Sequence, residues 1–142
     1  MSPGVWLAVD VGTVRVGVAR SDPGGVLASP WVTLARDVKS NSDIAELAEL
    51  TRSAGAVGVV VGLPRTLRGQ EGASAVMARD YAARLAEAVR PVPVVHLDER
   101  LTTVSAQRKL RQVGVRGRAQ RAKIDQAAAV ELLQHWLDGR SR

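Results

Sequence analysis

Near its N-terminus the chain carries the sequence Val5-Trp6-Leu7-Ala8-Val9-Asp10-Val11-Gly12-Thr13-Val14-Arg15-Val16-Gly17-Val18-Ala19. The apolar run up to Val11 is typical of a buried strand, and the alternation that follows Gly12-Thr13 indicates a second strand. Asp10 stands at the end of the first strand, where a buried carboxylate is costly unless something compensates its charge. A metal ion, a metal-bound phosphate or a backbone cap could each do so.

The composition describes a globular chain without covalent cross-links. Its 142 residues predict a single domain over 1–142, and the absence of cysteine excludes a disulfide framework and a thiolate zinc site. No apolar run approaches the roughly 20 residues of a membrane span, and the N-terminus lacks a signal-peptide pattern. We therefore expect a cytoplasmic protein with no membrane partner.

Positive charge is concentrated in one part of the sequence. The formal net charge is +6, and no acid lies between Glu99 and Asp125, a stretch that holds Arg100, Arg108, Lys109, Arg111, Arg116, Arg118, Arg121 and Lys123. A local excess of this kind attracts polyanions over about a Debye length of 10 Å. It favours a nucleic-acid partner, although an ordinary solvated, arginine-rich surface is the simpler alternative.

The first half of the chain predicts a strand meander followed by a helix. A third strand over 25–34 would complete a meander over 5–34. Ser40 is the expected N-cap of the helix and forms a capping-box-like pair with Asp43, while Gly55 is the expected C-cap. The buried face of this helix is expected to carry Ile44, Leu47, Ala48 and Thr51.

The second half alternates strands and helices. Apolar runs over 56–61 and 92–97 predict buried parallel strands. Between them a helix carries a core stripe of Met77, Tyr81, Leu85 and Ala88. A further helix is expected from Thr102 or Thr103 to about Gln112, and a last one over roughly 122–137. The packing face of that last helix would carry Asp125, Ala128, Ala129, Leu132 and Trp136.

This order, β-β-β-α-β-α-β-α-α, predicts an α/β fold with a five-stranded mixed sheet flanked by helices and the first strand in its middle. Ligand sites in such sheets lie beyond the carboxyl ends of the parallel strands. Asp10, the loop 62–72 and the pair Asp98-Glu99 should therefore meet at one edge. Because strand side chains alternate, only one member of the pair should face the site, and the pattern does not say which.

Three acids from distant positions, without thiolates, suit a hard cation such as Mg²⁺ or Mn²⁺. Two such ions can activate a water and stabilise the leaving oxygen of a phosphodiester. The simpler interpretations are a turn-capping role for Asp10 and a favourable helix-dipole position for Asp125.

The loop 62–72 lacks the Lys-Ser/Thr of a phosphate-binding Walker A motif, but its glycines with Arg65 and Arg68 suit contact with a phosphate chain. An ordinary exposed loop is equally compatible. His96 and His135 are expected to be structural or surface residues.

Four segments together resemble the YqgF/RuvX family, nucleases assigned to pre-16S rRNA and also described as Holliday-junction-resolvase-like proteins. The segments are Ala8-Val9-Asp10-Val11-Gly12-Thr13-Val14-Arg15-Val16-Gly17-Val18-Ala19, Val61-Gly62-Leu63-Pro64, Leu97-Asp98-Glu99-Arg100-Leu101-Thr102-Thr103 and Lys123-Ile124-Asp125-Gln126-Ala127-Ala128-Ala129. They follow the family's order along the chain. The string Asp-Glu-Arg-Leu-Thr-Thr is highly specific, whereas Asp-x-Gly-Thr alone is weak.

The resemblance implies an RNase H-like fold and a metal-dependent nuclease of the two-metal-ion type. Asp10, Glu99 and Asp125 match the family's acidic triad, as catalytic residues and ligands of Mg²⁺ or Mn²⁺, which favours Glu99 over Asp98. The implied role is processing of the 5′ end of pre-16S rRNA in ribosome biogenesis, with precursor rRNA or ribosomal particles as partners. Thr66 and Arg68 replace the family's commonest Asn and Asp, which favours phosphate contact in that loop.

Two alternatives stay open on the sequence. The same site could cleave four-way junctions of branched DNA, for which a homodimer would suit symmetric cutting, or the chain could be a non-catalytic RNA-binding module. An actin-like ATPase would need a second lobe, for which the chain is too short. Arg15 is expected to contact the substrate or support the site. The full set of expected nucleic-acid contacts is Arg15, Arg65, Arg68, Arg100, Arg108, Lys109, Arg116, Arg118 and Lys123.

Overall fold

The computed structural model describes residues 4–64, 72–99 and 118–140. Five strands form one sheet: β1 (Trp6–Val11), β2 (Arg15–Ser21), β3 (Ala28–Ala35), β4 (Gly58–Leu63) and β5 (Val94–Asp98). The described helices are α1 (Ser42–Ser53), α2 (Ala73–Val89) and α4 (Arg118–Arg140). The helix predicted from Thr102 or Thr103 to Gln112 lies outside the described residues.

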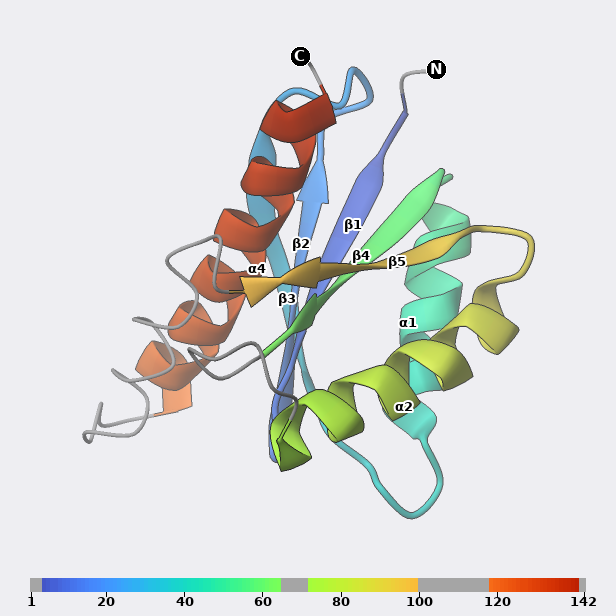
Figure 1. Cartoon of the computed structure of the whole chain (residues 1–142), viewed down its shortest axis with the longest axis vertical. Helices are drawn as coiled ribbons and strands as arrows, with labels where there is room; N and C mark the ends of the chain where they lie inside the picture. Colours follow the sequence, from blue (N-terminus) through green and yellow to red (C-terminus); the bar gives the residue numbers. More distant parts are fainter. Residues whose placement is uncertain (1–3, 65–71, 100–117, 141–142) are drawn as a thin grey trace.

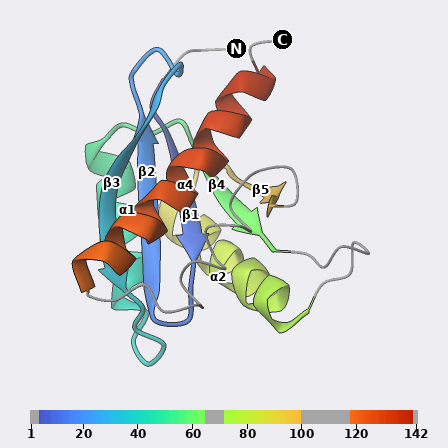
Figure 2. The same ribbon diagram turned by 90° about the vertical axis from the view of Figure 1, so that its left-hand side faces the viewer.

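The sheet is mixed, with β1 at its centre. Its strand order is β3-β2-β1-β4-β5; β1 pairs antiparallel with β2 and parallel with β4, and β5 extends the parallel half. Helices α1 and α2 cover one face of the sheet, and α4 runs across the other (Figures 1 and 2). The predicted meander, the central position of the first strand and the five-stranded mixed sheet are confirmed.

Strand alternation divides the interior into two hydrophobic clusters. On β1, Leu7 and Val9 pack with α1 and α2, whereas Trp6 and Ala8 pack with α4. Successive side chains of a strand point to opposite faces, so Asp10 belongs to the α4 face. That assignment decides which helix can approach it.

Helix α4 packs against the sheet between Asp125 and Leu137. Leu132, Leu133 and Leu137 are fully buried, and the Trp136 ring lies 5.3 Å from the Trp6 ring. The residues predicted for its packing face are buried, except that Trp136 is half-buried. In the described part of the chain, no helix is long and apolar enough to cross a membrane.

The start of α1 differs from the prediction. Asn41, in the left-handed conformation at φ 55°, is the N-cap, and its own side chain makes no capping hydrogen bond, so the expected cap at Ser40 is wrong. The Asp37 carboxylate instead accepts hydrogen bonds from the Ser42 hydroxyl and from nearby backbone N–H groups. These bonds lower the pKa of Asp37 to about 2, and the Ser42 hydroxyl has the largest effect. The C-cap is Ala54, and Gly55, the residue predicted for the cap, follows it at φ +62°, so the predicted end is correct to within one residue.

The other half of the expected capping box, Asp43, is buried in a polar cluster. Its carboxylate accepts hydrogen bonds from Arg36 Nη1 and from the Tyr81 hydroxyl, each at 3.0 Å, and from the backbone N–H of Asp37 at 3.2 Å. Burial, and then the neighbouring Asp43 charge, raise the pKa of Tyr81 far above its ordinary value. Asp43 therefore ties α1 to α2 and to the end of β3.

We expect replacement of Asp43 to be strongly destabilising. In Asp43→Ala the buried Arg36 guanidinium loses its counter-charge, which typically costs about 3–5 kcal/mol. Tyr81→Phe removes one hydrogen bond to a charged group, worth roughly 1.5–3 kcal/mol. Urea unfolding of both variants measures these losses.

The matched control is Asp80→Ala, which breaks the exposed Asp80–Arg84 pair on α2. Surface pairs contribute about 0–1 kcal/mol. If Asp43→Ala were no less stable than Asp80→Ala, the buried cluster would have no structural role.

Candidate active site

Asp10 lies fully buried near the carboxyl end of the central strand, between two glycines. Across the antiparallel pairing it stands opposite Gly17 on β2. On its other side, Gly62 of β4 lies one residue beyond the parallel pair Val9–Val61. At this level of the sheet, the α4 face therefore carries one carboxylate between two positions that have no side chain.

Gly17 allows α4 to sit directly on β2. A Cβ atom at this position would lie 2.2 Å from the backbone oxygen of Asp125 and 3.0 Å from the Asp125 Cβ. Separations below 3.0 Å are sterically forbidden, so any other residue would force the helix away. As a result Asp125 lies on the sheet beside the Asp10–Gly17 pair, with 1% of its surface exposed.

Gly62 plays the same part for Glu99, the residue that follows β5. A Cβ atom on Gly62 would lie 2.5 Å from Glu99 Oε1 and 2.9 Å from Leu132 Cδ1 of α4. Glu99 is 1% exposed, whereas Asp98, the last residue of β5, is only half-buried. Of the two acids, Glu99 is thus the one whose carboxylate lies over Gly62, on the face that α4 covers.

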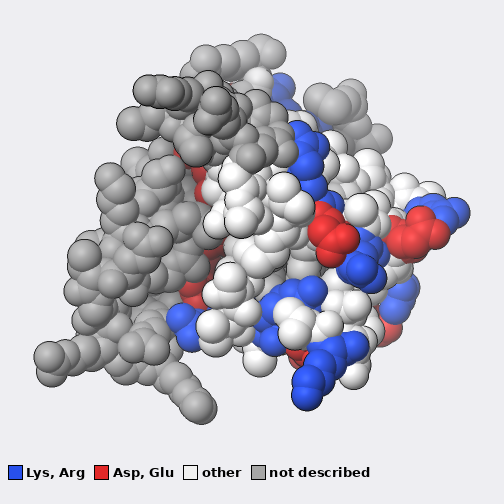
Figure 3. Space-filling view, turned by 60° about the horizontal axis from the view of Figure 1, so that its bottom comes forward, with Lys and Arg blue, Asp and Glu red and all other residues white. Residues whose placement is uncertain are grey.

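One strong contact fixes Asp125 to the strands. Arg15 Nε donates a hydrogen bond to Asp125 Oδ2 at 2.8 Å, joining residues 110 positions apart in sequence. Buried carboxylates require compensating charge or donors, and Arg15 supplies both to Asp125. Figure 3 views the lower edge of Figure 1, where β1 ends: some acidic side chains are recessed at the left of the described surface, and others are interspersed with Lys and Arg side chains on the right.

These residues match a hard cation in the kind of donor they offer. We call the carboxylates of Asp10, Glu99 and Asp125 the carboxylate site. They supply only oxygen atoms, the ligands that Mg²⁺ and Mn²⁺ prefer. Gly17 leaves room for the backbone of Asp125, and Gly62 leaves room for the carboxylate of Glu99, on either side of Asp10. Among the residues that the structure describes, however, no three His, Cys, Asp or Glu side chains form a group that could hold a metal ion as they stand.

Most of the predicted nucleic-acid contacts fall outside the described residues. Lys123 is exposed on α4, two residues before Asp125. Arg118 begins the same helix, without a described side chain. Outside the described residues lie Arg65, Arg68, Arg100, Arg108, Lys109 and Arg116. His96 and His135 are exposed, as expected of surface residues.

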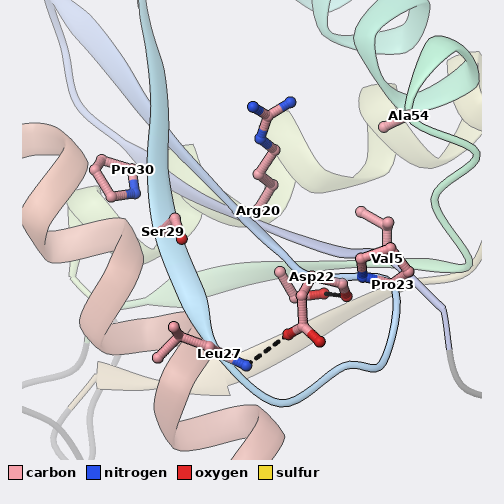
Figure 4. A pocket seen from close by; sticks show the side chains of 9 residues that line it. Val5, Arg20, Asp22, Pro23, Leu27, Ser29, Pro30 and Ala54 are labelled. Carbon is pink, nitrogen blue, oxygen red and sulfur yellow. Dashed lines mark hydrogen bonds between the residues drawn. The ribbon is translucent and has the colours of Figure 1, made fainter.

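A pocket of about 410 Å³ lies at the opposite end of the sheet, near the turn between β2 and β3 (Figure 4). The Asp22 carboxylate beside it is occupied by the backbone N–H groups of Gly24, Val26 and Leu27, which also lower its pKa. The other residues that line this pocket are mostly apolar. The carboxylate site, at the other end of the strands, is thus the stronger functional candidate.

Comparisons with known proteins identify the family of the chain. A family model described as "RuvX: Holliday junction resolvase" matches residues 4–139. The chain belongs to this family. A protein of Frankia casuarinae named "Putative pre-16S rRNA nuclease" is 59% identical over 96% of this chain and 67% of its own length. One of Mycobacteroides abscessus with the same name is 55% identical over 96% of this chain and 82% of its own length.

Solved structures place the RuvX-family chain in a known fold. Thermus thermophilus RuvC in complex with a Holliday junction substrate superposes with a TM-score of 0.57 at 14% identity, covering 97% of this chain and 96% of RuvC. A second RuvC structure gives a TM-score of 0.51 at 16% identity and covers 96% of each chain. The expected RNase H-like α/β fold is confirmed.

We expect Gly17→Ala to displace α4. The added methyl group meets backbone rather than a movable side chain, and overpacking of this kind typically costs about 1–3 kcal/mol. A lower melting temperature and a changed near-ultraviolet circular dichroism of the Trp6–Trp136 pair would report the shift.

The control is Gly139→Ala within α4 itself, where an added methyl group has open space. Alanine is favoured over glycine in a helix by about 0.5–1 kcal/mol, so this variant should be slightly more stable than the parent. Equal stability of Gly17→Ala and the parent protein would contradict the close approach of α4.

Proposed function

We propose that the chain is a metal-dependent nuclease that hydrolyses phosphodiester bonds of structured nucleic acid at the carboxylate site. The observation that carries the proposal is the arrangement of Asp10, Glu99 and Asp125, three buried acids from separate elements, for two of which glycines leave room on either side of Asp10. Membership in the RuvX family and the names of the curated relatives support it.

Asp10, Glu99 and Asp125 would hold Mg²⁺ or Mn²⁺, and their side chains would have to turn to share an ion. A bound ion of this kind supplies Lewis-acid stabilisation and an activated water. The charge argument is simple: a phosphodiester is an anion that carboxylates alone repel, and a divalent cation held among them makes its approach favourable.

The chain's own residues would prepare the site in three ways. Burial of Asp10 on the central strand gives the site a rigid base. Packing of α4 onto Gly17 excludes bulk water beside it, which strengthens electrostatic interactions. The Arg15–Asp125 contact holds the third carboxylate in a defined orientation, as partners of metal ligands commonly do.

The favoured substrate is precursor 16S rRNA, in keeping with the names of the curated relatives. Cleavage of a four-way DNA junction is the second candidate, favoured by the description of the family model. Both polymers present the same phosphodiester to the carboxylates, so the substrate has to be distinguished by assay. Lys123 and the basic stretch over 100–123 would contribute attraction to either polymer through the overall positive charge.

The decisive assay compares a 16S rRNA precursor extended at its 5′ end with a four-way DNA junction, each with Mg²⁺ or Mn²⁺ and with chelator. We expect metal-dependent cleavage of the RNA. Asp10→Asn should lower the cleavage rate on the order of 10³-fold, equivalent to about 4 kcal/mol of transition-state stabilisation.

Asp138→Asn is the control, because Asp138 is exposed on α4 and bonds only to Gln134 of the same helix among the described residues. It should cleave at the parent rate. Cleavage that survives Asp10→Asn, or salt-sensitive binding without turnover in any metal, would refute the nuclease and leave a binding module.

A further inference from the structure

Arg15 is held from one side only. The Nε–Oδ2 contact with Asp125 is the single hydrogen bond or ion pair of this guanidinium in the part of the chain that the structure describes. The Arg15 side chain is 24% exposed, whereas its partner is 1% exposed. Its Nε thus bonds to a buried carboxylate, while the side chain as a whole stays partly exposed.

A guanidinium has enough donors for two partners. Of its five N–H groups, one lies on Nε and four on the terminal nitrogens, in a planar fork that matches two oxygens of a phosphate. Nε is engaged by Asp125, and the terminal nitrogens make no hydrogen bond or ion pair within the residues that the structure describes. A lysine has a single ammonium at the end of a flexible stem and lacks a second, separately directed edge.

The backbone that carries Arg15 is well anchored. Arg15 begins β2, its carbonyl accepts a hydrogen bond from Gly12 N at 2.9 Å, and it pairs with Ala35 of β3. Together with the Asp125 contact, these bonds orient the side chain before any ligand arrives. Ordering a long side chain on binding costs roughly 0.5–1.5 kcal/mol, which a pre-oriented arginine avoids.

We propose that Arg15 binds a backbone phosphate of the nucleic acid through its terminal nitrogens while its Nε edge positions Asp125. The inference rests on the proposed function in that the ligand is a nucleic acid. It adds that a single side chain links the phosphate of the substrate to one carboxylate of the site. Substrate position and the orientation of Asp125 are then coupled through one rigid group.

Equilibrium binding without metal tests this separately from cleavage. The probes are a fluorescent RNA stem-loop and a fluorescent four-way DNA junction, titrated in EDTA at several salt concentrations. Each phosphate contact contributes about 0.7–0.9 to the slope of log K against log salt. We expect Arg15→Gln to reduce that slope by about one contact, with the larger loss on whichever polymer is the ligand.

Arg20→Gln is the matched control, since it removes the same charge from the other end of β2. Arg20 is exposed and stacks on Trp31 at 4.6 Å, and the slope of this variant should equal that of the parent.

Arg15→Gln leaves Asp125 buried without its arginine and could therefore destabilise the fold. A second variant separates loss of binding from loss of stability. Arg15→Lys keeps a positive charge for Asp125, so we expect a melting temperature near that of the parent together with the reduced slope. Parent-like slopes in both Arg15 variants, or equal slope losses in Arg15→Gln and Arg20→Gln, would overturn the proposal. Arg15-dependent binding without cleavage in Mg²⁺ or Mn²⁺ would instead refute only the nuclease.

Discussion

The close approach of α4 to the sheet is the constraint on which the carboxylate site depends. It is possible only because Gly17 presents no side chain where the backbone of Asp125 descends. On the other side of the central strand, Gly62 likewise leaves space for the carboxylate of Glu99. The missing side chains of the flanking strands therefore leave room for the two acids beside Asp10.

The two faces of the sheet treat buried aspartates differently. On the α1 and α2 side, Asp43 is surrounded by an arginine, a tyrosine hydroxyl and a backbone N–H group, all closed within the structure. On the α4 side, Asp125 bonds to an arginine whose side chain is partly exposed to solvent. The first arrangement is typical of a structural cluster, whereas in the second the partner of the buried acid is itself partly exposed to solvent.

Much of the fold could be predicted from the sequence because the strands are long apolar runs and the helices carry regular stripes. Asp10 was recognisable as an acid ending a buried strand, and strand alternation limited the choice between Asp98 and Glu99. The cap at Ser40 could not be predicted correctly, because Asp37 and the left-handed Asn41 compete for the same turn. The role of Gly17 was also missed: a glycine within a strand signals a close approach, but nothing local identifies the partner 108 residues away.

The Arg15–Asp125 contact also bears on when the site can form. It joins the second strand to α4 across 110 residues, and contacts of such long sequence separation are slow to form because a large loop must close first. The sheet can assemble around its own strand pairs, but the carboxylate site is incomplete until α4 docks. A chain that is still folding, or one that has lost this helix to proteolysis, would hold Asp10 and Glu99 without Asp125. Nuclease activity at the proposed site would then be confined to the completed fold, so a partly folded chain would not cleave nucleic acid.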